Sequence, residues 1–597
     1  MSTIKEHRSS IGSHILRQAT AVKKVEFQLP KNLKGTLLNF TNGLDHRPYK
    51  DLVCILRDSE VKDKELCLLL REAQDCVSLL DQNLCLFIQV LLIVKWAHRG
   101  PEAVAAFQSF LLDLCSAHSY HTKAVLDHLI VNFKGASLGS DESTEWTSGM
   151  PTPEEERIFQ NIHCVLNRLL RVIPMAGDIL LPSIISAFPY IKRSTKEHQA
   201  FVHNMLEILK YQPKFRKDFL YLITKKLVDL DTHAPRSEIE QAEDDDAMDV
   251  DEDIFSMEQE QGHKHPIAKT LDHLMMRLFT FIKHECTDPS TGETTLDRSY
   301  SVYKDFQEVF EKVILLTHNT HHVQFLMWFI CSLRPKLAEV YVKYLWRLVL
   351  GIHVAPVTRQ SAAAYVASFL ARANFIKIEF LKSTLQEMSD WIHSYINNQD
   401  GQKTVEMRLH IVFYSVCQAL FYLLCFRHKD LFRTKQNMVF LRGLNLTKMV
   451  TCTLNPLRVC LPELVKKFSS ITRAYQLVYC NSVIERNSRN SVPIVHTRNH
   501  VMQADQPSSL LETFFPFDPY KLKRSSCVID PTYQVYQDDD ISEETTEKAD
   551  NDDDDDFLPE VSISASFNDK RFTYSASPGF LHDHHTSTSS PRLRHFV

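Results

Sequence analysis

The side chains that most resemble a metal or catalytic site in this sequence are histidines. His321 and His322 are adjacent, and His582, His584 and His585 stand close together further along the chain. Adjacent residues on a helix point about 100° apart, and no cysteine or carboxylate near His321 completes a ligand set. We therefore interpret His321 and His322 as structural or exposed residues, and the later three as adventitious metal binders.

The 14 cysteines do not form the pairs that bind zinc, since no two are separated by two residues. Scattered thiols are typical of a reducing compartment, where cysteine packs as a small apolar side chain. The sequence also contains no P-loop, no Gly-rich dinucleotide fingerprint, no His-Glu-x-x-His and no Gly-x-Ser-x-Gly. We expect no enzymatic activity, no metal and no cofactor.

No segment of the sequence predicts contact with a membrane. Met1–Lys24 is polar and lacks the apolar core of a signal peptide. The apolar run Leu84–Val94 is shorter than the about 20 residues that cross a bilayer, so we interpret it as a buried helix.

The net charge of −6 combines two acidic segments with a basic remainder. Glu238–Glu260 contains 12 acidic residues and no Lys or Arg, and Gln537–Asp556 contains 12 with only Lys548 opposing them. Without these segments 67 basic and 50 acidic residues remain, a net charge of +17. Runs of like charge stay disordered and often serve as interaction tails. The two segments are therefore either solubilising loops or competitors of acidic partners for the basic body.

The elements that position these residues are helices. From Pro48 onward, apolar residues recur at intervals of three and four, and only 14 glycines interrupt the chain. Predicted helices after the exposed loop 137–153 cover residues 158–172, 178–188, 196–210, 214–230, 266–285, 299–316, 321–333, 336–350, 358–373, 375–397, 405–428, 445–452, 457–467 and 470–486. A helix pair thus recurs about every 40 residues, as in HEAT and armadillo repeats. An irregular helical bundle is the alternative.

The predicted fold is all-α, a HEAT-like helical-repeat solenoid with a disordered acidic loop and disordered termini. Between Phe514 and Tyr536, three prolines block a helix, while six aromatic residues are costly to leave in water. The predicted domains are a flexible N-terminal segment 1–43, N-terminal helical repeats 44–235, a disordered acidic loop 236–264, C-terminal helical repeats 265–490, an extended aromatic and Pro-rich segment 491–536 packing on the repeats, and an acidic, Ser/Thr-rich disordered tail 537–597.

Two stretches are candidates for binding. Arg359–Lys382 contains a helix rich in alanine, which allows close packing, and places Arg372 in its last turn, where a cation suits the exposed carbonyls. Lys521, Lys523 and Arg524 follow the aromatic cluster and could meet phosphate, an acidic partner or the acidic run downstream.

Several blocks of sequence together resemble one known family. They are HPIAKTLDHLM at His265–Met275, SFLARANFI at Ser368–Ile376, WIHSYINNQD at Trp391–Asp400, CQALFYLLCFRHKDL at Cys417–Leu431, LNPLRVCLPELV at Leu454–Val465, YQLVYCNSVIERN at Tyr475–Asn487, LETFFPFDPYKLKRS at Leu511–Ser525 and IDPTYQVY at Ile529–Tyr536. With these blocks, residues 40 to 560 resemble the RNA polymerase I-specific transcription initiation factors, known in animals as TIF-IA.

The resemblance implies a non-enzymatic HEAT-repeat protein of the nucleus and nucleolus. It implies that the protein binds RNA polymerase I near its stalk and dock and bridges it to promoter-bound core factor, so that ribosomal RNA genes are transcribed. It further implies control by phosphorylation and a homodimer of the free protein. Accessory contact with promoter DNA is compatible with the basic body.

The resemblance also suggests site residues. The polymerase-contact candidates are Arg359, Leu370, Ala371, Arg372, Ala373, Asn374 and Lys377. Many family members have lysine where this chain has Asn374, which weakens a purely electrostatic account. Met175-Ala176-Gly177 stands where vertebrate relatives carry a phosphorylated Ser-Thr-Pro, so that control point is not carried over. The phosphorylation candidates are Ser137, Ser140, Ser143, Ser577 and Ser590, the last two because proline follows them.

The alternative function is a helical-repeat adaptor for nuclear transport or another nuclear assembly, whose basic body would hold acidic cargo. Such receptors usually show more regular internal repeats. Direct nucleic-acid binding is a further alternative, which a steep salt dependence would reveal.

Overall fold

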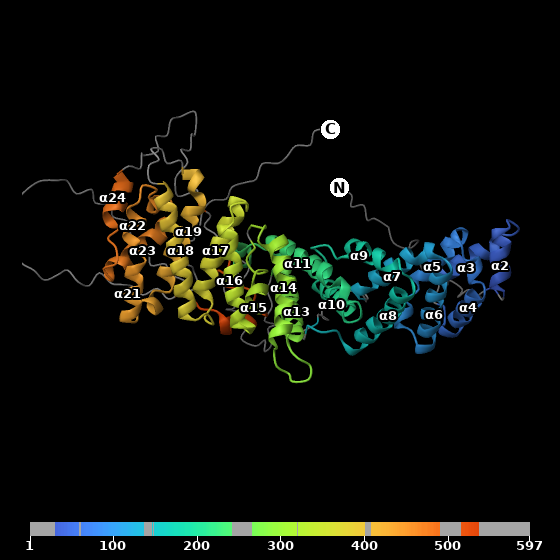
Figure 1. Ribbon diagram of the computed structural model, residues 1–597. Helices are drawn as coiled ribbons and strands as arrows, with labels where there is room; N and C mark the ends of the chain where they lie inside the picture. Colours follow the sequence, from blue (N-terminus) through green and yellow to red (C-terminus); the bar gives the residue numbers. More distant parts are fainter. Residues whose placement is uncertain are drawn as a thin grey trace, which may run out of the picture. The chain divides into compact units, whose positions relative to one another are not determined.

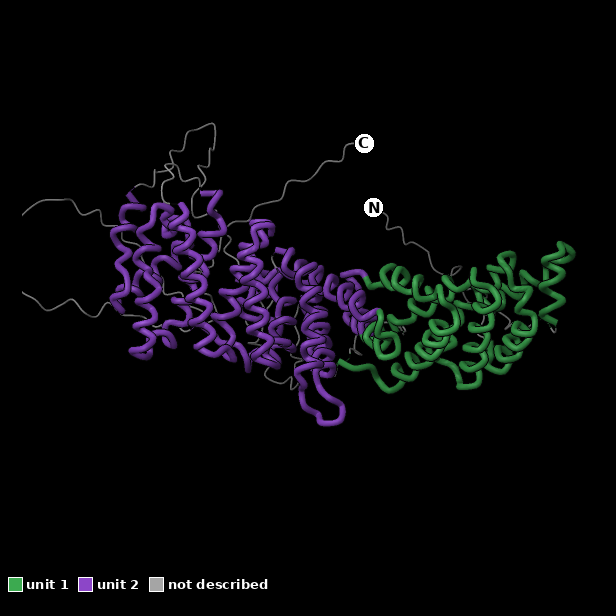
Figure 2. The backbone as a smooth tube through the Cα atoms, in the orientation of Figure 1, with its two compact units in different colours: residues 1–189, 203–214 green, residues 190–202, 215–597 purple. Residues whose placement is uncertain are grey.

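The computed structural model describes residues 30, 32–58, 61–135, 146, 149–240, 265–318, 320–399, 407–489, 511 and 515–536. It forms two units (Figure 2), of which unit 1 comprises Met1–Pro189 with His203–Lys214 and unit 2 comprises Tyr190–Val202 with Phe215–Val597. This division differs from the sequence-based one, which separated the repeats at the acidic segment 236–264.

Unit 1 is a stack of helices in two layers (Figure 1). Its helices are α2 (Leu33–Thr41), α3 (Arg47–Asp58), α4 (Asp63–Asp75), α5 (Cys85–Ile93), α6 (Pro101–Ala117), α7 (Thr122–Val131), α8 (Pro153–Val172), α9 (Ala176–Ala187) and the second half of α10 (Thr195–Tyr211). In one layer α3, α5, α7 and α9 pack each on the next, and α4, α6 and α8 do so in the other.

Unit 2 continues the alternation of short turns and helices. Its helices are the first half of α10, α11 (Arg216–Thr232), α13 (Pro266–Cys286), α14 (Leu296–Val309), the π-helix η8 (Phe310–Ile314), α15 (Phe325–Leu333), α16 (Pro335–Leu350), α17 (Pro356–Arg372), α18 (Ile378–Gln399), α19 (Ile411–Phe426), α20 (His428–Leu431), α21 (Lys435–Gly443), α22 (Leu446–Thr451), α23 (Pro462–Ala474), α24 (Asn481–Arg489) and α25 (Ser526–Ile529). Helix α17 packs between α16 and α19, and α19 in turn packs on α23.

The described part of the chain contains no β-strand, only the isolated bridges Thr287–Thr294 and Ala373–Tyr533. Short 3-10 turns join the helices: η1 (Val77–Leu79), η2 (Gln82–Leu84), η3 (Trp96–His98), η4 (Ser119–His121), η5 (Asn132–Lys134), η6 (Pro213–Phe215), η9 (Met407–His410), η10 (Pro456–Arg458) and η12 (Asp530–Thr532). The predicted all-α helical-repeat fold is therefore confirmed for these residues.

Local sequence signals explain where the helices begin. Thr152 and Glu155 form a capping box at the start of α8, in which each side chain bonds to the backbone of the other residue. Proline occupies the first turn of α6, α13, α16, α17 and α23, where its missing N–H would have no partner in a helix.

Three sequence-based expectations need correction. Helix α2 lies inside the segment 1–43 that was expected to be flexible, since Asn32 caps it and Leu33 and Leu37 are buried. The helix expected at 470–486 is broken between α23 and α24, where Gln476 adopts a positive φ of 52°. The expectation that no segment could span a membrane missed Met407–Phe426, a helix long and apolar enough to cross a bilayer, of which 78% of the most apolar window is buried inside the protein.

Candidate functional site

The predicted contact residues Leu370, Ala371, Arg372 and Ala373 lie in the core of unit 2, with no exposed surface. The first three end helix α17 and Ala373 follows it; the helix packs on α16 and α19 and buries small side chains such as Ala363. These four residues can therefore influence a partner only by positioning their neighbours.

Arg372 is held by contacts inside the protein. Its guanidinium lies 4.7 Å from the ring centroid of Phe426 and 5.4 Å from that of Tyr533. One of its nitrogens lies 3.6 Å from a carboxylate oxygen of Asp518. A fully buried arginine requires such charge and ring partners, because an uncompensated charge in the core is costly.

The remaining contact candidates reach the surface. Asn374 and Lys377 are exposed in the turn between α17 and α18. Arg359, in the first turn of α17, is partly exposed, and its Nε donates a hydrogen bond of 2.7 Å to the carbonyl of Val349. Burial lowers the pKa of Arg359.

The exposed turn is joined to the C-terminal residues of the described chain. The amide of Asn374 donates to the carbonyl of Thr532 (3.2 Å), and its side-chain Nδ2 donates to the carbonyl of Pro531 (3.0 Å). The amide of Gln534 donates to the carbonyl of Arg372 (2.7 Å). Asn374 and Lys377 thus lie beside residues 530–535 in one continuous surface.

We call residues 515–536 the C-terminal strap. Phe517 is its central anchor, completely buried, with ring centroids 5.1 to 5.7 Å from those of Phe325, Trp328, Tyr365 and Phe369. At the two ends of the strap, the Phe515 ring stacks on Tyr422 at 4.2 Å and the Tyr536 ring lies 5.3 Å from Phe426. Aromatic packing therefore fixes the strap across α15, α17 and α19.

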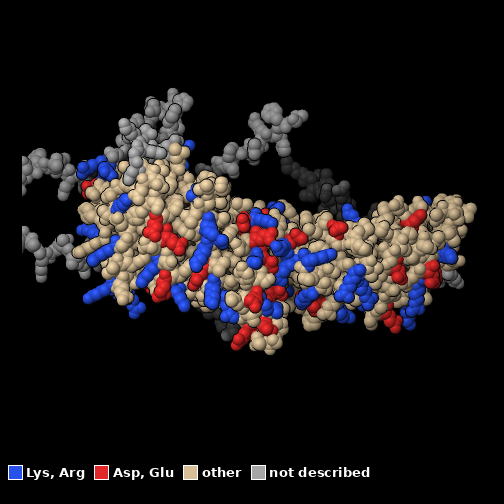
Figure 3. Space-filling model, in the orientation of Figure 1, with Lys and Arg blue, Asp and Glu red and all other residues tan. Residues whose placement is uncertain are grey.

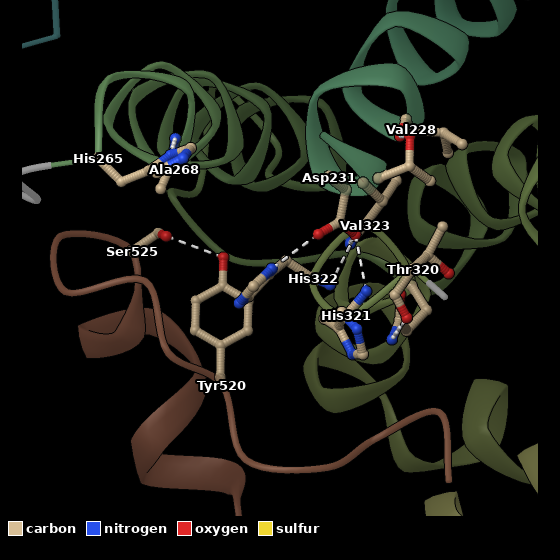
Figure 4. Close-up of polar contacts among 12 residues, drawn as sticks. Val228, Asp231, His265, Ala268, Thr320, His321, His322, Val323, Tyr520 and Ser525 are labelled. Carbon is tan, nitrogen blue, oxygen red and sulfur yellow. Dashed lines mark hydrogen bonds and ion pairs between the residues drawn. The ribbon is translucent and has the colours of Figure 1, made fainter. Parts of the chain in front are cut away.

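Buried polar contacts hold the middle of the strap. The backbone amides of Arg524 and Ser525 donate to the two carboxylate oxygens of Asp272 in α13, at 2.7 and 2.8 Å. The hydroxyl groups of Ser525 and Tyr520 lie 2.8 Å apart, and the Tyr520 ring meets the edge of His322 (Figure 4). The strap is thus integral to unit 2.

Asp231 of α11 organises the chain that leads into α15 (Figure 4). One of its oxygens accepts backbone hydrogen bonds from His321 and His322 (both 2.9 Å) and Val323 (3.1 Å). Its other oxygen lies 2.8 Å from Nδ1 of His322. Burial alone would raise the pKa of Asp231, but the attraction of His322 and hydrogen bonds from that residue lower it below its usual range.

These contacts with Asp231 explain why two histidines stand next to each other here. His322 is buried, and burial lowers the pKa of His321. No group of three or more His, Cys, Asp or Glu side chains could hold a metal ion within the described ranges. The geometry of the site supports binding through the surface that Asn374 and Lys377 form with residues 530–535.

Some site residues carry no recognisable sequence signal. Asp231 looks like an ordinary helical polar residue. Asp272 and Ser368 lie in the blocks that carry the family resemblance, but nothing in those blocks indicates that they bond to the distant strap. The phosphorylation candidates Ser137, Ser140, Ser143, Ser577 and Ser590 lie outside the described residues.

Comparisons with known proteins cover most of the chain. Residues 28–541 match the family model of the RNA polymerase I specific transcription initiation factor RRN3. A mouse relative, RNA polymerase I-specific transcription initiation factor RRN3, is 34% identical over 82% of this chain and 78% of its own length. The fission yeast (Schizosaccharomyces pombe) relative of the same name is 25% identical over 78% of this chain and 80% of its own.

A solved structure agrees with the fold. The crystal structure of RNA polymerase I transcription initiation factor Rrn3 superposes with a TM-score of 0.65 at 19% identity, over 84% of this chain and 97% of that one. The family model matches the strap as well as the helices. The chain belongs to the family of RNA polymerase I-specific transcription initiation factors.

Proposed function

We propose that this protein binds RNA polymerase I near its stalk and dock and bridges it to promoter-bound core factor, acting in the nucleus and nucleolus on ribosomal RNA genes. The observation that carries the proposal is the match of the family model over residues 28–541. The helical scaffold suits such a role, since a protein that acts by binding needs stiff surfaces.

The polymerase-facing surface would include the turn after α17 and the exposed part of the strap. Asn374, Lys377, Asp530 and Val535 are exposed there, and the hydrogen bonds of Asn374 fix the turn against the strap. A rigid surface of this kind loses little conformational freedom on binding, which favours affinity. Arg359 would contribute at the edge, whereas the buried Leu370–Ala373 would only support the turn.

The test is capture of purified RNA polymerase I by the full chain. We expect Lys377→Glu combined with Asn374→Asp to weaken capture at least about tenfold, because like charges across an interface are strongly disfavoured. The matched control is Lys336→Glu, an exposed lysine on α16. Equal capture by both variants would exclude this surface, and no capture by the wild-type protein would refute polymerase binding itself.

Regulation by phosphate belongs to the same proposal. Phosphates on Ser137, Ser140, Ser143, Ser577 or Ser590 would add negative charge and repel an acidic docking surface. Phosphopeptide mapping from growing and starved cells tests this, and we expect occupancy at these serines to differ between the two states.

Two accessory contacts are also proposed. The basic body would touch promoter DNA in the assembled complex, and affinity for duplex DNA should then fall steeply with salt. The free protein would form a homodimer, whose mass should appear in sedimentation equilibrium and disappear on polymerase binding.

A further inference from the structure

The C-terminal end of unit 2 is strongly basic. Residues 407–489 contain 13 Lys and Arg but only three Asp and Glu, a net charge of +10. Figure 3 shows blue side chains along the end of unit 2 that α21 to α24 form in Figure 1. Most of the net positive charge of the described residues is thus concentrated in one region.

Part of this charge gathers around one contact between helices. The rings of Phe432, directly after α20, and Tyr475, directly after α23, lie 4.1 Å apart, which joins the ends of these two helices. The cations of α20, of the turn into α21 and of α23 form what we call the α20–α23 basic surface: Lys429, Arg433, Lys435, Lys466, Lys467 and Arg473. All are exposed except Lys467, which is half-buried.

Four of these six cations are not neutralised by carboxylates of the described residues. Asp430 is already bonded to the buried Arg427, at 2.7 Å. Among the described residues, no ion pair joins Arg433, Lys435, Lys466 or Arg473 to a carboxylate. Like charges gathered this way repel one another, so the surface favours an acidic occupant.

The described chain ends beside this surface. Nζ of Lys467 lies 5.9 Å from the ring centroid of Tyr536, and that ring also packs on Phe426 at the end of α19. The next residues are Gln537–Asp556, with 12 acidic side chains and one lysine. Twenty residues span at most roughly 70 Å, so every part of this acidic segment can reach the basic surface.

The other acidic segment begins elsewhere. Glu240, near its start, lies 3.4 Å from Lys521 in the middle of the strap and is bonded to Arg236. Only the segment after Tyr536 therefore starts at the α20–α23 basic surface. Tethering gives it an effective concentration in the millimolar range.

We propose that residues 537–556 occupy the α20–α23 basic surface of the same chain and screen it from other acidic partners. The contact is electrostatic and weakens with salt, since exposed charges are screened beyond about 10 Å at 0.1 M ionic strength. The proposal is independent of polymerase binding, so the two can fail separately.

Zero-length carbodiimide cross-linking of the full chain, followed by mass spectrometry, tests the contact. At about 0.05 M salt we expect carboxylates of 537–556 to join Lys429, Lys435, Lys466 and Lys467, with yields falling several-fold at about 0.5 M. Changing Asp552, Asp553, Asp554, Asp555 and Asp556 to Asn should lower these yields at least about threefold. The matched control changes Asp244, Asp245, Asp246, Asp249 and Asp251 to Asn and should leave them unchanged.

A second measurement decides whether the surface is screened. The fivefold Asp-to-Asn variant of 552–556 should bind a short DNA duplex several-fold more tightly than the wild-type chain at low salt, because a competing polyanion has been weakened. Cross-links from 537–556 spread evenly over lysines of the whole chain would overturn the proposal. Equal DNA affinity of the variant and the wild-type protein would do so as well, since the surface would then be open already.

Discussion

The backbone amide of Phe517 donates a hydrogen bond of 2.9 Å to the hydroxyl of Ser368, a side chain without exposed surface in the middle of α17. This bond and the ring of Phe517 seat the strap in an aromatic pocket of α15 and α17. The strap is therefore part of the core of unit 2, although it lies far from those helices in sequence.

Phe517→Ala should destabilise unit 2 by about 3–5 kcal/mol, because it removes a fully buried ring and leaves a cavity. Urea denaturation followed by tryptophan fluorescence measures the loss, since Trp328 touches Phe517. Val535→Ala, at a strap residue with 45% exposure, serves as the control and should change stability by less than about 0.5 kcal/mol. An unchanged denaturation midpoint for Phe517→Ala would contradict the role of the ring.

Arg372→Ala should destabilise unit 2 by about 3–5 kcal/mol, because it removes a buried guanidinium from its contacts with Phe426, Tyr533 and Asp518. The same denaturation experiment applies. Lys377→Ala, in the adjoining exposed turn, should stay within about 0.5 kcal/mol. If the two variants were equally stable, the buried guanidinium would contribute nothing to the fold.

Asp231→Asn should destabilise the protein at pH 7 by about 3 kcal/mol, through weaker hydrogen bonds to three amides and His322. The folded-state pKa of Asp231 is lowered, so its contribution is present above the unfolded pKa of about 3.9 and is lost as pH falls through the folded value. The stability difference between variant and wild type should therefore narrow in strong acid. Asp218→Asn, exposed on the same helix, should show no such pH dependence, and a difference that stayed constant would contradict the assignment.

Unit 1 should weaken on mild acidification. Burial lowers the pKa of His163 to about 4, although Asn204 raises it in part, and lowers that of His128 to about 4. Because the unfolded histidines take up protons near pH 6.5, stability is lost as pH falls from about 6.5 towards 4. Hydrogen exchange in α7 and α8 should speed up markedly between pH 7 and pH 5, after correction for intrinsic rates.

The matched variant for this prediction is His163→Gln. His163 lies 2.8 Å from the hydroxyl of Tyr211 and 2.9 Å from the amide oxygen of Asn204, and glutamine does not titrate. Part of the acid sensitivity should disappear in α8 while that of α7, next to His128, remains. Identical pH profiles for the variant and the wild-type protein would point to another titrating group.

Helix positions followed well from the sequence because they depend on local signals. The predicted helix 358–373 lies within two residues of α17, and the predicted helix 158–172 ends at the same residue as α8 although it begins five residues later. Where a boundary depended on backbone conformation, as at Gln476 with its positive φ, the periodicity of apolar residues did not reveal it.

The surroundings of Arg372 could not be read from the sequence. An arginine in the last turn of a helix normally lies at the surface near the free carbonyls, and its charged head is expected in water. Its partners Phe426, Asp518 and Tyr533 come from a neighbouring helix and from the strap, and only the folded chain brings them together. The exposed turn at Asn374 and Lys377 depends on the same long-range contacts.

The late position of the strap in the chain has a consequence for biosynthesis. A nascent polypeptide emerges from the ribosome with α15 and α17 long before Phe517 follows, so the pocket around Trp328 and Phe369 stays open during that time. Exposed aromatic surface on a growing chain invites aggregation and chaperone binding. Unit 2 therefore cannot finish folding when its helices have been synthesised, because its core is completed only by the strap. Premature termination before residue 515 would release a protein with an unfilled core.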